Sequence, residues 1–214
     1  MKTRVEQLTR DSVIDAAAEL VAESGYDTLS MRTLGERCGV SAMTLYRYVE
    51  TKEDLLGALA DRLLGELTPA PIANATWQEE IAHVFRGLHR MLKEHPELAE
   101  IANRQHLNGR HSYEGAESVL AALRRAGITG EPAASAFAAL TSYTIGFTQR
   151  QTGAHSEDTL AARLAVVGEL PAERFRNVVE LGGTFLVRHS DPQFEDGLAL
   201  LIEGLEGRAA RAGA

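Results

Sequence analysis

The chain has 214 residues, a formal net charge of −8, 44% hydrophobic residues and a single cysteine. This apolar content is ordinary for a globular protein, and no apolar run reaches the roughly 20 residues that a membrane-spanning helix needs. One cysteine excludes an intrachain disulfide, and the N-terminus has no apolar signal core, so we expect a cytoplasmic protein with no membrane partner.

Three short helices are predicted near the N-terminus. A first helix should run from Thr9, a capping residue, to about Ser24. A second begins after Ser30 and carries apolar residues at i, i+3 and i+7. Gly39 ends it, and a third helix is expected over residues 42–48. Two helices joined by a glycine turn are typical of a helix-turn-helix, whose second helix enters the DNA major groove.

The third helix turns Leu45 inward and leaves small, hydroxyl-bearing and basic side chains outside. These side chains permit close approach to base edges and phosphates. Before it, Arg32 can reach a guanine, and after it Lys52 can share a phosphate with free N–H groups of the next helix. The candidate DNA contacts are Arg32, Ser41, Ala42, Met43, Thr44, Tyr46, Arg47, Tyr48 and Lys52.

The acidic net charge argues at first against a nucleic-acid partner, but phosphate contact depends on the charge of the local face. Asp15, Glu19 and Glu23 recur at i, i+4 and i+8 along one stripe of the first helix. That stripe can face solvent, away from DNA, so the balance of charge does not exclude a DNA-binding face.

Four blocks of the head occur in a specific order: Leu29-Ser-Met-Arg-Thr-Leu, Gly39-Val-Ser, Thr44-Leu-Tyr-Arg-Tyr-Val and Lys52-Glu-Asp-Leu-Leu. Over residues 9–64 this order resembles the N-terminal domain of the TetR family of transcriptional repressors. The resemblance implies a three-helix DNA-binding head, a helical C-terminal domain for ligand and dimer contacts, and release from DNA when a small molecule binds.

The domain organisation follows from the prolines of Thr68-Pro-Ala-Pro, which stop a helix. Residues 1–50 are expected to form the DNA-binding domain, 51–67 a connecting helix, and 68–214 the ligand-binding and dimerisation domain. We find no convincing strand pattern and no repeat, so the predicted fold class is all-α with about nine to ten helices. The expected body helices cover residues 76–94, 96–107, 112–126, 131–151, 159–167, 171–189 and 191–208.

Two body helices have faces suited to helix–helix contact. The last helix carries apolar residues at spacings of 4, 3 and 4, and the stretch from Ala133 to Gly146 is rich in small residues. We expect both to pair with the same helices of a second copy, because two heads read two half-sites. The alternative is that both stripes fill the core of one chain. The candidate dimer residues are Phe194, Leu198, Leu201, Ile202 and Leu205.

An effector pocket between the body helices should be mainly apolar with a few polar groups. Aromatic and polar side chains on the body helices are the candidates, although each of them can also serve as ordinary core. They are Trp77, Leu88, Met91, His106, Tyr113, Phe137, Tyr143, Phe147 and Gln151.

Residues 77–151 resemble, more loosely, the tetracycline-responsive branch of the family. His106 falls where that branch places a magnesium-binding histidine, but Thr68 stands in place of a second histidine. Val84 and Leu88 replace an Asn and a Phe, and Arg150 stands where an acidic partner is expected. A cation beside a Mg²⁺ site is electrostatically unfavourable, so we expect a metal-free effector, polycyclic or antibiotic-like, and no cofactor.

Catalytic motifs are missing from the sequence. The seven histidines include no pair at i and i+4, and there is no nucleophile elbow or phosphate loop. We therefore expect no enzyme but a ligand-responsive regulator, a homodimeric repressor that binds a palindromic operator and leaves it when an inducer binds. The alternative is a helical small-molecule-binding or protein-interaction module without operator-specific DNA binding.

Overall fold

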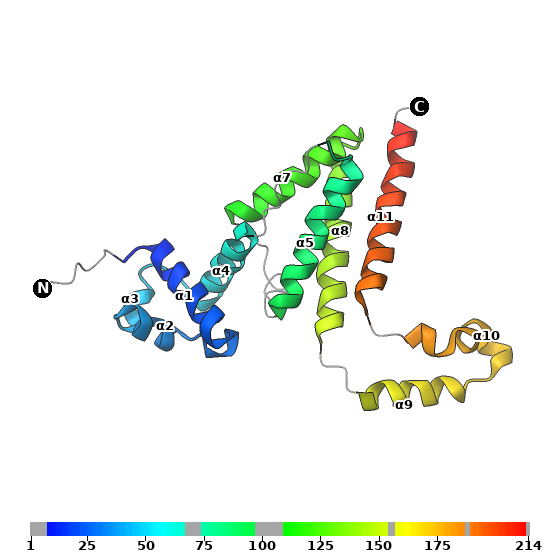
Figure 1. The fold of residues 1–214 in the computed structure, drawn as a ribbon, viewed down its shortest axis with the longest axis horizontal. Helices are drawn as coiled ribbons and strands as arrows, with labels where there is room; N and C mark the ends of the chain where they lie inside the picture. Colours follow the sequence, from blue (N-terminus) through cyan, green and yellow to red (C-terminus); the bar gives the residue numbers. More distant parts are fainter. Residues whose placement is uncertain (1–7, 67–73, 97–108, 154–156, 187–188, 213–214) are drawn as a thin grey trace, which may run out of the picture.

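The computed structural model describes residues 8–66, 74–96, 109–153, 157–186 and 189–212. Within these ranges every regular element is a helix, which confirms the predicted all-α class. In the same ranges no helix combines the length and apolarity that crossing a membrane requires. A small N-terminal head is joined through one helix to a larger helical body (Figure 1).

The head begins as the sequence predicts. The Thr9 and Ser30 side chains each accept a hydrogen bond from the backbone N–H three residues on, and both helix starts form capping boxes. Gly39 adopts the left-handed conformation, with φ 68°, that ends the second helix. The head elements are α1 (Arg10–Ser24), η1 (Tyr26–Thr28), α2 (Met31–Cys38), α3 (Ala42–Leu45) and α4 (Lys52–Glu66).

Helix α3 is shorter than predicted and ends at Leu45 instead of Tyr48. The N–H groups of Arg47 and Tyr48 donate to carbonyls three residues back, at 3.2 and 2.8 Å. Such bonds tighten the chain into a turn, and the aromatic and β-branched residues at 46, 48 and 49 are weak helix formers. The buried side chains of Leu45 and Val49 anchor this turn to the head core.

The acidic stripe of α1 is exposed, as expected, but it also binds the neighbouring helices. The Arg37 guanidinium of α2 donates to Glu19 and Glu23 at 2.7–2.8 Å. Asp15 accepts a hydrogen bond from Arg62 of α4 at 3.1 Å. Three carboxylates of the stripe therefore hold α1 against α2 and α4, which fixes the platform on which α3 sits.

Close packing at the helix-turn-helix depends on Gly35. A Cβ atom at this position would lie 2.8 Å from the Val40 carbonyl oxygen and 3.1 Å from the Ala42 nitrogen. Both are backbone atoms that a side chain cannot displace cheaply. A residue without a Cβ is therefore what lets the turn and the start of α3 lie against α2.

The body is built around α5, which packs against α7 and α8, while α11 lies along α8 and α5 (Figure 1). Thr76 caps α5 and forms a capping box with Glu79. The helix predicted over 96–107 falls almost wholly outside the described residues. The elements of this bundle are α5 (Trp77–Glu94), α7 (Arg110–Arg125), α8 (Gly130–Thr152) and α11 (Asp191–Ala212).

Between α8 and α11 a helical hairpin projects away from the bundle (Figure 1). It consists of α9 (Glu157–Gly168), α10 (Ala172–Leu181) and η2 (Gly182–Leu186). The single helix predicted over 171–189 is wrong, because Gly182 takes φ 49° and ends α10.

The stripe of α11 is buried by its own chain. Phe194, Leu198, Ile202 and Leu205 are each no more than 8% exposed and lie in the core cluster of the body. Within the single chain these four side chains fill the core of the body, so little of their surface is left to meet a second copy. Leu201 is half-buried at the edge of the same cluster.

Candidate DNA-binding face and effector site

The predicted recognition helix presents its candidate side chains outward. Met43 is 78% exposed and Tyr46 is 46% exposed, while Leu45 beneath them is buried. The Ser41 hydroxyl accepts from the Thr44 N–H at 3.2 Å and also lies 2.9 Å from the Thr44 hydroxyl. Local hydrogen bonds thus hold two hydroxyl groups at the start of α3, where a duplex groove would be met.

The basic residues of the head differ in whether they form ion pairs with acidic side chains. Arg10 pairs with Asp54, whereas Arg47 and Lys52 make no ion pair within the described part of the chain. Among the described residues Arg32 pairs only with Glu36, at 3.1 Å on an open surface, where such pairs are worth about 0.3–0.5 kcal/mol. Contacts to phosphates or bases would therefore cost little in lost ion pairs at Arg47, Lys52 and Arg32.

Tyr48 lies differently from the other candidates. It is half-buried and packs against the head core, next to the buried Val49. Its aromatic ring therefore supports the turn after α3, and only part of the side chain is exposed. The small residue Ala42, at the first position of α3, is half-buried as well.

The head is fastened to the body by Asp61 of α4, which is 9% exposed. One carboxylate oxygen accepts from the Ser112 N–H and hydroxyl, both at 2.8 Å. The other accepts from the His111 N–H at 3.3 Å and lies 3.1 Å from its Nδ1. Asp61 thus caps the N-terminus of α7, whose own N-cap residue, Gly109, supplies no side chain.

Two consequences follow from this contact. Burial alone would raise the pKa of Asp61, but the hydrogen bonds from Ser112 and His111 outweigh it and leave the pKa lowered. Gly109 is required because a Cβ atom there would lie 1.8 Å from the Asp61 Cγ. The sequence shows neither residue as functional, because they lie far apart in the chain.

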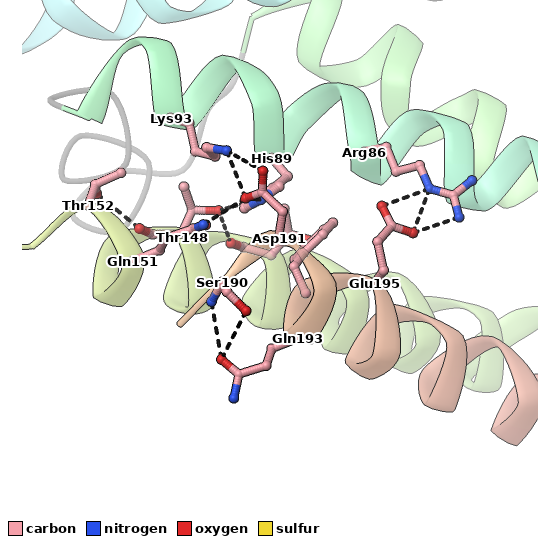
Figure 2. Close-up of polar contacts among 12 residues, drawn as sticks. Arg86, His89, Lys93, Thr148, Gln151, Thr152, Ser190, Asp191, Gln193 and Glu195 are labelled. Carbon is pink, nitrogen blue, oxygen red and sulfur yellow. Dashed lines mark hydrogen bonds and ion pairs between the residues drawn. The ribbon is translucent and has the colours of Figure 1, made fainter. Parts of the chain in front are cut away.

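A second polar cluster is buried in the body, where α5, α8 and the start of α11 meet (Figure 2). His89 of α5 stacks on Phe194 with ring centroids 3.8 Å apart and is almost wholly buried. Its Nδ1 lies 2.8 Å from the Thr148 hydroxyl oxygen. Because the Thr148 hydroxyl donates to the Thr144 carbonyl at 2.7 Å, its oxygen must accept from His89 Nδ1–H.

This assignment leaves the other ring nitrogen of neutral His89, Nε2, without a proton. Among the described residues, His89 Nε2, the Thr144 hydroxyl and the Gln151 Oε1 are buried polar atoms without a hydrogen-bond partner. Each such orphan group costs about 1–3 kcal/mol of desolvation. Native cores rarely tolerate several of them together, so this cluster has the character of a binding site.

Asp191, the first residue of α11, closes the cluster on its outer side. The Lys93 Nζ donates to both of its carboxylate oxygens at 2.7 Å, and the Gln151 amide donates to one at 2.7 Å. These contacts, that with Lys93 first, lower the pKa of Asp191 to about 2. Its Oδ1 is 3.5 Å from His89 Nε2, which is too long for a good hydrogen bond.

Aromatic rings frame the same cluster. Phe147 lies edge-on to His89 at 6.2 Å and to His189 at 4.9 Å between ring centroids. Tyr143 stacks on Phe194 at 5.6 Å, and its hydroxyl donates to the backbone carbonyls at the start of α11. Burial is the main reason that the pKa of Tyr143 is raised, so its hydroxyl stays protonated.

Two family models match this chain. One, described as bacterial regulatory proteins of the tetR family, matches residues 13–59. The other, a tetracyclin repressor-like C-terminal domain, matches residues 70–209, and so covers the body that holds the buried cluster. The chain belongs to the TetR family.

Named relatives agree with this assignment. An HTH-type transcriptional regulator of Saccharopolyspora erythraea is 33% identical over 204 residues, which cover 94% of this chain and 86% of the relative. The transcriptional repressor DrrR1 of Streptomyces coeruleorubidus is 30% identical over 145 residues, which are 67% of this chain and only 54% of DrrR1. This TetR-family chain thus spans about half the length of DrrR1.

The fold agrees as well. Apo ActR of Streptomyces coelicolor superposes with a TM-score of 0.84 at 30% identity, over 96% of this chain and 98% of ActR. ActR in complex with actinorhodin superposes with a TM-score of 0.81, over 95% of this chain and 99% of ActR. The TetR-family chain is a ligand-responsive transcriptional repressor, and its family is one of regulators and not an enzyme class.

The TetR body brings together only some of the predicted effector contacts. Phe147 lies against His89, Tyr143 contacts Phe147, and Gln151 donates to Asp191 at the same cluster. Met91, in contrast, is buried in the head-side core, and Tyr113 is 61% exposed on α7. Trp77, Leu88 and Phe137 are half-buried at the edges of the body core, and His106 lies outside the described residues.

Sequence reasoning missed His89, Lys93, Thr144, Thr148 and Asp191. A signal was present for His89, because it follows Ile81 and Phe85 at i+8 and i+4 on the apolar face of α5. A histidine on such a stripe is predicted to be buried. Its partners could not be found in this way, because Thr148 is 59 residues away in the chain.

Replacing Asp61 by Ala should lower the free energy of unfolding of this TetR-family protein. Loss of the charged cap leaves the N-terminus of α7 without its acceptor, at a cost of about 2–3 kcal/mol. Chemical denaturation of the wild type and the variant measures this loss in the free energy of unfolding. The matched control, Glu117→Ala on the exposed side of α7, should change stability by no more than about 0.5 kcal/mol. Equal losses in both variants would contradict the role of Asp61.

The stability of the body should fall as the pH drops through the His89 titration. Burial lowers the pKa of His89, with Lys93 adding to it and Asp191 and Glu195 opposing it. The unfolded chain therefore binds the proton first, at a pH of about 6.5, and stability present above that pH is lost below it. Asp191, with a pKa of about 2, stays ionised throughout this range.

Denaturation at about pH 7.5 and about pH 5.5, on either side of the ordinary His pKa, measures this loss. A His89→Phe variant should show a flatter pH dependence than the wild type, whatever its absolute stability. An unchanged slope in His89→Phe would show that His89 does not titrate in this way.

Proposed function

We propose that this protein represses transcription as a cytoplasmic homodimer that binds a palindromic operator and leaves it when an effector enters the body. The observation that carries this proposal is the exposed α3 surface, with its hydroxyls and the available cations Arg47 and Lys52. A module without operator-specific DNA binding would have no need to keep this surface free.

In the proposed DNA complex, different side chains around α3 contact the bases and the phosphates. Ser41, Thr44 and Tyr46 supply hydroxyls, and Met43 supplies an apolar tip, to base edges and the thymine methyl. Arg47 and Lys52 supply charge to phosphates, and Arg32 approaches from the start of α2. The head as a whole is not basic, so two heads acting together are needed for tight binding.

The effector side rests on the buried cluster around His89, which combines orphan polar atoms with aromatic rings. ActR, similar to this chain over almost its whole length, is known in complex with actinorhodin. We expect a related use of the body here, without metal.

The homodimer rests on surfaces of α8 and α11 that the single chain leaves open. Ala134, Ala138 and Ser142 follow one another at i, i+4 and i+8 on the exposed side of α8. On α11, Leu200 is 68% exposed and Gly204 lies one turn further along. Small residues allow helices to approach closely, and an exposed leucine gains from being covered. The proposed interface therefore uses the two helices that the sequence analysis named, but through their exposed sides and not through the buried stripe of α11.

Operator binding can be tested with the DNA upstream of the gene for this protein. In a gel-shift assay Arg47→Ala should weaken binding about tenfold and reduce the slope of log affinity against log salt by about 1 per head. Thr44→Val should weaken binding without changing that slope, because it contacts bases. The control Arg124→Ala, an exposed arginine on α7, should bind like the wild type. Wild-type binding by both head variants would refute the assigned face.

Dimerisation can be tested by replacing Leu200 with Glu. A buried carboxylate at a helix–helix interface is costly, so the variant should sediment as a monomer at concentrations where the wild type is a dimer. Tyr113→Glu, at an exposed apolar site on α7, should leave the mass of the dimer unchanged. If Leu200→Glu remains dimeric, the α8–α11 face is not the interface.

A further inference from the structure

Two of the three buried polar atoms that lack a partner in this cluster, His89 Nε2 and Gln151 Oε1, can only accept hydrogen bonds, whereas the third, the Thr144 hydroxyl, can also donate. Thr148 fixes neutral His89 with its proton on Nδ1, so that Nε2 can only accept. The amide nitrogen of Gln151 is already donated to Asp191, so that its buried Oε1 can only accept as well. Two buried acceptors on facing helices therefore lack a donor among the described residues, and the molecule that satisfies them must bring donors.

The charge of the cluster decides what kind of donor fits. Asp191 is already neutralised by Lys93, which contacts both carboxylate oxygens at 2.7 Å. An ammonium group entering beside His89 would face the Lys93 cation without a free counter-ion. A neutral donor, such as a hydroxyl, meets the two acceptors without this repulsion.

The walls of the cluster decide what carries the donor. Phe194 covers one face of the His89 ring, and Phe147 and Tyr143 complete an aromatic frame at centroid distances of 5.5–6.2 Å. Flat aromatic molecules gain both burial and ring–ring contacts against such walls. Asp191, the first residue of α11, is more than half exposed, so the cluster reaches the surface of the body on this side.

We propose that the effector is a neutral hydroxylated aromatic molecule, and that one of its hydroxyl groups donates to His89 Nε2 while a second donor reaches Gln151 Oε1. The proposal rests on the effector-responsive function given above and adds the chemical class of the effector and its anchoring atoms. His89 is the specificity-determining residue, because a ligand without a donor would leave its nitrogen buried and unpaired.

The test is a calorimetric titration of the full chain without DNA, using three naphthalene probes that differ in one substituent. They are 2-naphthol, its methyl ether, which lacks the donor, and 2-naphthylmethylammonium, which is a cationic donor. The naphthol should bind about tenfold more tightly than the ether, as one net hydrogen bond predicts, and more tightly than the ammonium probe. Equal or weaker binding of the naphthol, or none at its solubility limit, would overturn the proposal.

Two variants locate the site. Gln151→Met and His89→Phe should each reduce the preference for naphthol over its ether, His89→Phe to about equal binding. Gln149→Met, the same change on the exposed side of α8, should keep the wild-type preference. A preference that survives in both His89→Phe and Gln151→Met would place the hydroxyl elsewhere and refute the assignment.

Imidazole nitrogen NMR covers the case in which His89→Phe does not fold. In the wild type the Nε2 resonance of His89 should report an unprotonated nitrogen and should shift with naphthol but not with the ether. No shift with naphthol would refute the contact. Because these measurements contain no DNA, a failure of operator binding would be seen separately in the gel-shift assay, and neither result would mask the other.

Discussion

The arrangement of this molecule depends on one buried carboxylate. Asp61 belongs to the last helix of the head, yet its carboxylate oxygens accept hydrogen bonds from the first turn of α7 in the body. A charge in such a place is stable only while its donors stay in position, because water cannot replace them. The place where α7 begins therefore sets the position of α4, and α4 in turn carries the platform on which α3 is held.

Helix α5 gives the effector site a second physical route to the head. His89 faces the polar cluster, while Met91 and Leu92, less than one turn further, are buried in the same core as α1, α2 and α4. A shift of α5 that accommodates a guest must therefore be felt on both sides of the helix. For such a shift to release DNA, the effector must bind the released arrangement more tightly than the operator-bound one.

The sequence was sufficient where the signals are local. Helix caps such as Thr9, Ser30 and Thr76 act over three residues, and their helices begin where the sequence predicts. The roles of Asp61 and His89 arise from contacts 50 and 59 residues away, which no local pattern encodes. The apolar stripe of α11 was ambiguous for another reason, since the same periodicity serves a core and an interface between copies. The TetR-family resemblance and, for the described elements, the all-α class were predicted correctly, because both depend on short segments of sequence.

The only tryptophan of the chain, Trp77, stands at the first position of α5 and packs against the edge of the body core. The head holds tyrosines but no tryptophan, so the emission of the indole ring belongs to the body alone. Tryptophan fluorescence therefore reports on the body side of the Asp61 contact only. Fluorescence followed beside circular dichroism would reveal whether the two parts melt as one cooperative unit or come apart in sequence.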